Sequence, residues 1–388
     1  GGKTSLAEVM LFNTGATNRI GRIEDGNTLL DFEPEEIRRQ TTISSGIHQL
    51  MWNKASITLI DTPGDQNLFS ETRLCMPAAD GFLVVVDAVD GIKVQTEKAW
   101  EFAAEFGRPC LIVINKLDRE RASFQRALED IEKTIDLKPV VLQLPIGKEA
   151  GFKGVVDLLR LKAFVYDKDG KGKTGEIPAD MQDQVESARE ELIENIAEAD
   201  DELLERYLEG ETLDTEVLKA ALRKGTFERQ FVPVLCTAAT VNIGIDLLMS
   251  SVVDLLPEPA DLPPMQAVGP DGETPVERKA DPEEPFAAFV FKTIADPYAG
   301  RLSVFRVVSG KLGGDGTFFN INKDVKERYN QLLMMMGKEQ KPLDSAEAGM
   351  IVAVAKLKET VTGDTLCDEK SKVTFNCAKP LPNLISYA

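Results

Sequence analysis

The sequence predicts an α/β domain with a mainly parallel sheet and helices on both faces, followed by an antiparallel β-barrel domain. Short β-branched runs alternate with amphipathic stretches over the first two-thirds of the chain, which is typical of repeated strand-helix units. Alternating strands separated by glycine-rich turns come after a proline-rich segment and indicate the barrel. At 388 residues the chain exceeds what one hydrophobic core usually serves, so we expect two or three domains.

Short apolar runs are the predicted strands of the first domain. They cover residues 56–60, 81–86, 110–114, 140–144 and 232–236. Polar or turn residues follow each run, and ligands of open α/β sheets bind outside the carboxyl ends of the strands. We therefore expect the functional residues in the loops that follow these strands.

An acidic helical segment interrupts the strand-helix rhythm. Residues 178–211 carry one apolar stripe and one carboxylate face, which predicts a helix within an α+β insert at about residues 147–230. The carboxylate face has two interpretations. It is either a solvated surface or a docking surface for a basic partner.

Composition sets the other boundaries. Prolines and acidic residues cluster in residues 257–285 and predict a linker of low helix and strand content. The first domain then spans residues 1–256 and the barrel residues 286–372, and we expect the tail 373–388 to lead into a third domain that this chain lacks. The predicted barrel strands are residues 286–292, 301–309, 317–321 and 350–356.

Charge and composition exclude several classes of function. The formal net charge of −19 makes free DNA a poor partner, because binding to a nucleic-acid backbone needs a basic face. The five scattered cysteines are consistent with reduced thiols. His48 is the single histidine in the sequence, so catalytic triads that depend on histidine are not expected. No apolar run approaches the roughly 20 residues of a membrane span, and no export signal is visible. We expect a cytoplasmic monomer without membrane contact.

The chain opens with a phosphate-binding pattern. Gly1-Gly2-Lys3-Thr4-Ser5 matches the second half of the P-loop G-x-x-x-x-G-K-[ST]. In that motif Gly2 lets the backbone approach phosphate, and Lys3 neutralises the β and γ phosphates. The hydroxyl of Thr4 would bind Mg²⁺, and Ser5 would lie near the α phosphate. Short G-K-T runs also occur by chance, so the motif needs support from elsewhere.

A second pattern, Asp61-Thr62-Pro63-Gly64, supplies that support. An apolar strand that ends in D-x-x-G places the Asp61 carboxylate near Mg²⁺ and the Gly64 amide at the γ phosphate. Either motif by itself is compatible with an ordinary strand ending in a turn. The segment between the two motifs contains Thr42, which is able to close over Mg²⁺ when a γ phosphate is present. The alternative interpretation of this segment is a polar strand edge.

The third pattern, N-K-x-D, selects the base. The Asp118 carboxylate accepts from two adjacent N–H groups of guanine that adenine cannot present, while the Lys116 stem lies along the ring. Asn115 precedes them at the end of a buried strand; the alternative interpretation of this motif is a helix cap. A later turn offers a backbone N–H to the guanine carbonyl, and its residues are Cys236, Thr237 and Ala238. Together the motifs predict a P-loop GTPase domain with GTP or GDP and Mg²⁺.

The order of these motifs resembles the translational GTPases, and longer segments resemble elongation factor G. Those segments include residues 85–91, 207–211, 296–302, 357–366 and 380–388. The resemblance implies a ribosome-bound GTPase that converts GTP to GDP and phosphate and promotes translocation of tRNA and mRNA. It also implies that the insert touches the ribosomal stalk protein and that the barrel contacts the small subunit.

One position departs from the family pattern. The family has histidine directly after D-T-P-G, where it orients the attacking water, and this chain has Asp65. A carboxylate only accepts hydrogen bonds and is repelled by phosphate charge. Lys3, Gly64 and Asp65 are therefore the candidate catalytic residues, with hydrolysis expected to be weak or altered. The alternatives are a GTP-dependent ribosome-binding module with impaired hydrolysis and a relative of release factors or ribosome-protection proteins.

Overall fold

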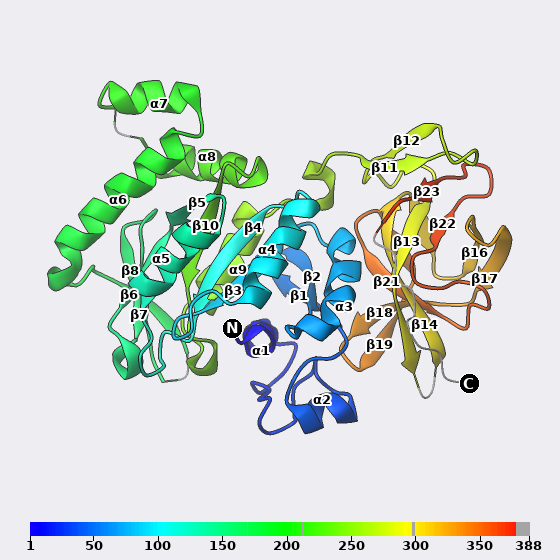
Figure 1. Ribbon diagram of the computed structural model, residues 1–388, viewed down its shortest axis with the longest axis horizontal. Helices are drawn as coiled ribbons and strands as arrows, with labels where there is room; N and C mark the ends of the chain where they lie inside the picture. The colour runs from blue at the N-terminus through cyan, green and yellow to red at the C-terminus, as the bar shows by residue number, and fades with distance from the viewer. Residues whose placement is uncertain (169, 212, 297–298, 378–388) are drawn as a thin grey trace. The chain divides into compact units, whose positions relative to one another are not determined.

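The computed structural model describes residues 1–168, 170–211, 213–296 and 299–377 (Figure 1). Two compact units divide the chain, and each is described by itself. The first contains Gly1–Asp25, Met51–Ala55 and Gly81–Leu256, and the second contains Gly26–Leu50, Ser56–Asp80 and the described residues from Pro257 onward. Every helix within these ranges is too short or too polar to span a lipid bilayer.

A parallel sheet forms the centre of the first unit. Its strands run in the order β3-β4-β10-β5 and every neighbouring pair is parallel. The bounds are β3 (Phe82–Asp87), β4 (Cys110–Asn115), β10 (Phe231–Cys236) and β5 (Lys138–Val141). All residues of β4 and β10 are buried, as expected for central strands covered on both faces. The predicted parallel sheet is confirmed. The expectation for residues 56–60 was wrong, because they form β2 (Ala55–Asp61), which belongs to the antiparallel sheet of the second unit.

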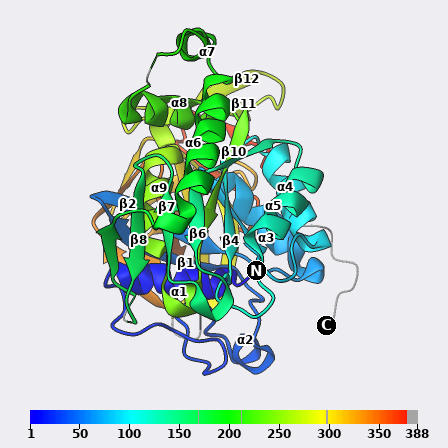
Figure 2. The same cartoon turned by 90° about the vertical axis from the view of Figure 1, so that its left-hand side faces the viewer.

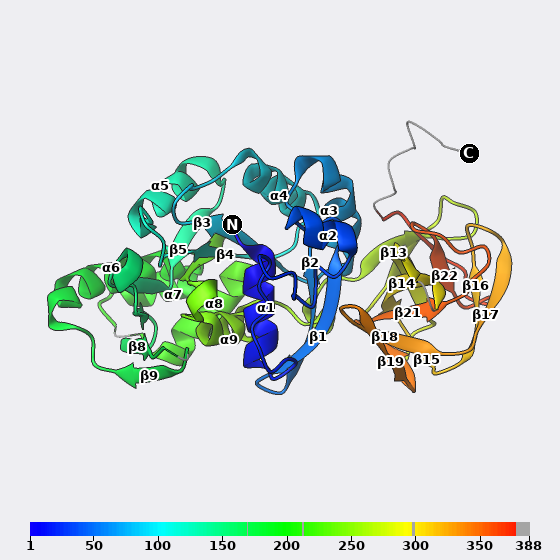
Figure 3. The same cartoon turned by 90° about the horizontal axis from the view of Figure 1, so that it is seen from below.

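Helices cover both faces of this sheet (Figure 3). On one side lie α4 (Val94–Glu105) and α5 (Phe124–Thr134), and on the other lie α1 (Lys3–Asn13) and α9 (Ile245–Leu255), with α8 (Thr215–Phe227) beside α9. Apolar residues at helical spacing on α5 pack into the same core as the strands; they are Ala127, Leu128 and Ile131.

The insert has its own antiparallel sheet. The predicted strand at 140–144 is divided, because β5 ends at Val141 and β6 (Gln143–Ile146) pairs with β7 (Gly154–Asp157) instead. β8 (Lys162–Tyr166) and β9 (Gly172–Gly175) complete this sheet.

The acidic segment forms two helices rather than one. α6 (Gln182–Ala197) packs on β5 and α8, and α7 (Asp201–Leu208) packs against α6 (Figure 2). The break between them is set by Asp200, whose side chain accepts a hydrogen bond from the Leu203 N–H at 3.3 Å and caps α7. The glutamates of α6 are exposed, while Leu192 and Ile196 are buried.

The second unit is built on an antiparallel sheet. Its path is β17-β16-β22-β13-β14-β21-β18-β1-β2, and β19 pairs with β18. The predicted barrel strands correspond to β13 (Ala287–Asp296), β14 (Gly300–Ser309), β16 (Gly316–Asn320) and β21 (Ile351–Ala355). The others are β1 (Gly46–Trp52), β2 (Ala55–Asp61), β17 (Val325–Tyr329), β18 (Leu332–Met336), β19 (Glu339–Leu343) and β22 (Thr365–Cys367), with β15 (Lys311–Gly313) and β20 (Ser345–Glu347) forming a separate pair.

Alternating residues of β13 enter two separate hydrophobic clusters. Ala288 and Val290 pack with Phe305 and Phe318, whereas Phe289 and Phe291 pack into a second cluster on the opposite face. This period of two follows from the pleat of a strand. The antiparallel β domain predicted from the sequence is confirmed.

The predicted linker contains strands that composition did not reveal. β11 (Met265–Val268) and β12 (Pro275–Arg278) form an antiparallel pair, in which Pro275 lies at the end of its strand. β23 (Thr374–Phe375), at the start of the predicted tail, pairs with β11. Proline is tolerated at strand ends and edges, so the proline content alone was misleading. Residues 297–298 and 380–388, which carried part of the resemblance, lie outside the described residues.

A buried carboxylate fixes the loop after β21. Glu327 on β17 accepts hydrogen bonds from the N–H groups of Lys358 (2.6 Å), Glu359 (3.1 Å) and Thr360 (3.1 Å), and from the Thr360 hydroxyl. Burial acts to raise the pKa of Glu327, but these donors lower it below its ordinary value. The ionised form therefore stabilises the folded domain.

We expect Glu327→Gln to lower the free energy of unfolding by about 3 kcal/mol, because buried N–H donors lose a charged acceptor. The depressed pKa means that this contribution is present above the ordinary pKa of 4.5 and is lost as the pH falls through the folded-state value. Urea unfolding at neutral and acidic pH measures both effects. Glu369→Gln, at an exposed ion pair with Lys326 on the same domain, is the control and should change stability by less than about 0.5 kcal/mol. A difference in the free energy of unfolding between parent and Glu327→Gln that does not change with pH would contradict the argument.

Candidate functional site

Asn115 joins three of the predicted site segments in the first unit. It ends β4, and its side chain is 1% exposed. Its Nδ2 donates to the carbonyl oxygen of Gly1 at 3.0 Å, and its Oδ1 accepts from the Thr237 hydroxyl at 3.1 Å and from the Ala239 N–H at 3.0 Å. The start of the chain, the N-K-x-D segment and the turn after β10 therefore meet at one amide.

Lys116 adopts a left-handed backbone conformation with φ of 67° and turns its ammonium toward Asp87. Its Nζ lies 2.5 Å from Asp87 Oδ2, at the end of β3. Burial acts to raise the pKa of Asp87, but the hydrogen bonds from Lys116 and the Val89 N–H hold it below its ordinary value. Asp87 was not among the predicted site residues; its place directly after a predicted parallel strand was the available signal.

Gly2 packs closely against this segment. It has φ of 82°, and a Cβ there would lie 3.1 Å from Asn115 Nδ2 and 3.5 Å from the Lys116 side chain. A left-handed conformation strains any residue with a Cβ. α1 begins directly after it at Lys3, so the N–H groups of the first turn, including those of Thr4 and Ser5, belong to a helix amino terminus.

Asp118 presents one acceptor that the protein does not use. Its Oδ2 accepts from the Thr240 hydroxyl at 3.1 Å. Its Oδ1 is buried and has no hydrogen-bond partner among the described residues. A buried carboxylate oxygen without a donor costs about 1–3 kcal/mol or more, so a ligand that supplied N–H groups here would stabilise the site. Thr240 is a second residue that the sequence did not single out.

The turn after β10 requires a correction. The N–H groups of Cys236, Thr237 and Ala238 donate to Gln143 Oε1 (3.0 Å), the Ile114 carbonyl (2.9 Å) and the Ile243 carbonyl (3.0 Å). Because each already has an acceptor, the expected donation from these residues to a guanine carbonyl is not supported. The N–H of Ala239 likewise donates to Asn115 Oδ1 at 3.0 Å, so the same argument applies to it.

The other predicted residues belong to the second unit. Asp61 is the last residue of β2, and both Asp61 and Thr42 are buried, whereas Gly64 and Asp65 are exposed. Asp65 Oδ1 accepts from the N–H (2.8 Å) and the side-chain amide (2.9 Å) of Asn67, and so caps the short helix Gln66–Leu68. The approach of these four residues to Lys3 and Thr4 stays a prediction.

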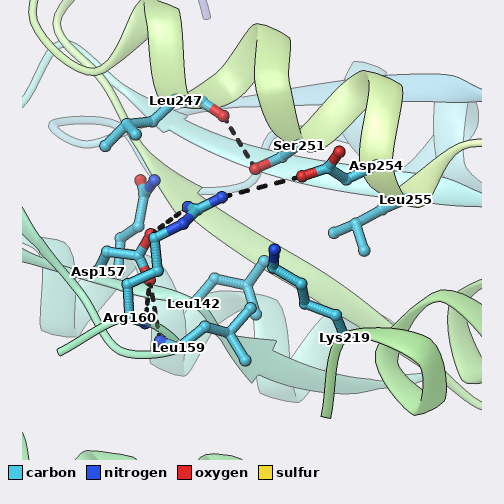
Figure 4. Close-up of a pocket in the computed structure, with 10 residues that line it drawn as sticks. Leu142, Asp157, Leu159, Arg160, Lys219, Leu247, Ser251, Asp254 and Leu255 are labelled. Atoms are coloured by element: carbon cyan, nitrogen blue, oxygen red, sulfur yellow. Dashed lines mark hydrogen bonds and ion pairs between the residues drawn. The ribbon is translucent and has the colours of Figure 1, made fainter. Parts of the chain in front are cut away.

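A separate pocket in the first unit contains none of the predicted site residues (Figure 4). Arg160 extends across it, with Nη1 at 2.6 Å from Asp157 Oδ2 and Nη2 at 4.0 Å from Asp254 Oδ2. Its cavity volume of about 40 Å³ admits a few water molecules and not a nucleotide. The other lining residues are Leu142, Gln143, Leu159, Lys219, Leu247, Ser251 and Leu255.

Both parts of the chain are similar to known proteins. Residues 1–258 match the elongation factor Tu GTP binding domain family, and residues 285–369 match elongation factor G domain 2. The chain is 40% identical over 374 residues to elongation factor G of Ureaplasma parvum serovar 3 and of Ureaplasma urealyticum serovar 10. Those alignments cover 96% of this chain and 54% of each relative, so the chain spans about half the length of these curated relatives.

A crystal structure of a protein from Thermus thermophilus shares the fold. Its TM-score is 0.85 at 30% sequence identity, with 99% of this chain and 54% of that chain covered. The family match, the parallel sheet and the Asn115-centred site all concern the same part of the sequence. The chain belongs to the family of the elongation factor Tu GTP binding domain, followed by a domain of the elongation factor G type.

Proposed function

We propose that the protein binds GTP and GDP and recognises guanine through Asp118. The observation that carries this proposal is the buried Oδ1 of Asp118, which has no hydrogen-bond partner in the described part of the chain, while Thr240 donates to its Oδ2. Guanine offers two adjacent N–H donors to one carboxylate, and adenine offers no such pair.

The opposite end of the nucleotide would lie at the amino terminus of α1. Lys3 would neutralise the β and γ phosphates, with the N–H groups after Gly2 adding a partial positive charge. Mg²⁺ in nucleotide sites is held by a few protein oxygens and by the phosphates, and it neutralises the charge on the phosphates. The hydroxyls of Thr4 and Thr42 and the carboxylate of Asp61 are oxygen donors of the kind it takes.

We infer an elongation factor G-type function, hydrolysis of GTP to GDP and phosphate coupled to translocation of tRNA and mRNA on the ribosome in the cytoplasm. The family membership and the domain of the elongation factor G type support this inference. The exposed carboxylates of α6 suit a contact with the stalk protein, and the β domain would contact the small subunit. Lys3 and the Gly64 amide would stabilise the transferred phosphoryl group.

A second candidate is a GTP-dependent ribosome-binding module with impaired hydrolysis. The observation in its favour is the Asp65 carboxylate, which occupies the place of the family's histidine and is already used to cap the turn at Asn67. An anionic cap does not readily orient a water toward an anionic phosphate.

Competition binding tests the shared part of both candidates. We expect unlabelled GTP and GDP to displace labelled GDP from the full protein, with ATP weaker by about 10³-fold or more, because ATP leaves the Asp118 acceptors unpaired. Equal displacement by ATP would exclude guanine recognition. Phosphate release with and without ribosomes then separates the GTPase from the binding module.

A further inference from the structure

One lysine of the antiparallel β domain is buried against two other segments of the same unit, a helix and a loop. Lys292 on β13 is 5% exposed. Its ammonium donates to the Glu71 carboxylate and to the Ser44 hydroxyl, the latter at 2.6 Å. Burying an ammonium is costly unless its hydrogen bonds are satisfied. The burial of the Lys292 ammonium therefore depends on both segments being in place.

A β-bulge in β13 turns the Lys292 side chain toward these two segments. Val290 pairs with Phe305 and Lys292 pairs with Val304, so Phe291 is an extra residue in β13. Regular alternation would turn Lys292 to the side of Val290, into the cluster that contains Phe305 and Phe318. The bulge turns it instead to the face of Phe291, whose cluster includes Cys75 of α3 (Phe69–Cys75).

Glu71 connects the lysine to the D-T-P-G loop. It lies on α3, which packs against β13. The neighbouring Thr72 is buried and donates its hydroxyl hydrogen to the Pro63 carbonyl at 3.1 Å. Lys292 lowers the pKa of Glu71 although burial acts to raise it, so the pair is ionised. The loop that ends at Gly64 is thus fixed to α3 one residue away from the ion pair.

Ser44 and Ser45 connect the lysine to the segment that follows Thr42. The Ser45 N–H donates to Glu71 Oε1 at 3.0 Å. The N–H groups of Ile43 and Ser44 each donate to Glu36 Oε1 at 3.0 Å, on α2 (Pro34–Arg39). The backbone immediately after Thr42 is therefore held by two carboxylates, one of which is the partner of Lys292.

We propose that Lys292 is a positioning residue for the state in which the protein binds a nucleotide with a γ phosphate. Its contacts fix the segments that contain Thr42 and Gly64 to the β domain at the same time. This inference rests on the proposed function. A nucleotide with a γ phosphate would use both segments, whereas GDP would use neither the Gly64 amide nor the closure of Thr42. Binding of GTP and ordering of the Lys292 contacts are then linked, and each stabilises the other.

Lys292→Met tests the proposal through the ratio of two affinities, that for a GTP analogue and that for GDP. We expect the affinity of the full protein for a non-hydrolysable GTP analogue with Mg²⁺ to fall about tenfold, with that for GDP changing less than about twofold. Lys292→Arg keeps the charge and should restore most of the ratio. Lys311→Met is the matched control, since Lys311 pairs with Glu283 on the surface of the same domain. Equal losses for both nucleotides, or an unchanged ratio, would overturn the proposal.

A second variant removes the risk that an unpaired Glu71 prevents folding. Glu71→Met combined with Lys292→Met removes both charges of the pair, so neither is left buried without its partner, and the variant is expected to fold. It should show the same selective loss of the GTP analogue as Lys292→Met, because the contacts to Ser44 and Ser45 are gone. An analogue-to-GDP ratio equal to that of the parent would count against the proposal. If the parent itself fails to prefer guanine over adenine nucleotides, the proposed function fails instead, and the two failures are distinguished.

Discussion

Asp118→Asn is expected to lower the affinity for GTP by about two to four orders of magnitude and to create affinity for xanthosine triphosphate. Two hydrogen bonds to a charged acceptor contribute roughly 1.5–3 kcal/mol each, and 1.4 kcal/mol corresponds to tenfold. An asparagine amide has one acceptor and one donor group. It therefore matches xanthine, which presents a ring N–H beside a carbonyl oxygen, and mismatches guanine.

Competition against labelled nucleotide measures this change of base specificity. Glu120→Gln is the matched control, because Glu120 is an exposed carboxylate two residues further along the chain and should leave all affinities unchanged. The Thr240 hydroxyl can still hydrogen-bond the side chain at position 118, so the loop conformation should persist. A variant that keeps its preference for GTP over xanthosine triphosphate would show that Asp118 does not read the base.

Asp65→His is expected to raise ribosome-stimulated phosphate release by about 10²-fold or more, within the range that a positioned general base or orienting group supplies. The native carboxylate is anionic and caps the turn at Asn67 through two hydrogen bonds. A neutral imidazole removes the repulsion from the γ phosphate and can both accept and donate. Single-turnover phosphate release with saturating ribosomes measures the step.

Two controls isolate the contribution of the imidazole. Asp65→Asn keeps an oxygen that can cap Asn67 but removes the charge, so an equal gain in that variant would assign the effect to charge alone. GDP affinity should change little in both variants, because GDP lacks the γ phosphate that the Asp65 carboxylate repels. A parent protein that already releases phosphate as fast as the histidine variant would contradict the expectation.

The buried strands at 110–114 and 232–236 and the N-K-x-D motif could be predicted because they depend on local signals, whereas the sheet that residues 56–60 join could not. The β-branched runs at 110–114 and 232–236 are buried strands, and N-K-x-D follows the first of them as expected. The segment at 140–144 was divided between two sheets, and prolines at 257–285 did not prevent β11 and β12. Which strand a short apolar run pairs with depends on partners that are distant in the sequence.

Local sequence patterns were sufficient to predict the α/β class, the order of the nucleotide motifs and Asp118 as the residue that reads the base. Which groups have unused hydrogen-bonding capacity became visible in the folded chain alone. Asn115 reaches Gly1 across 114 positions, and the N–H groups of residues 236–238 are used by partners elsewhere in the chain. The bulge at Phe291, which turns Lys292 toward Glu71, likewise exists only in the paired strands. Hydrogen-bond satisfaction is a property of neighbours in space, and a linear pattern does not contain it.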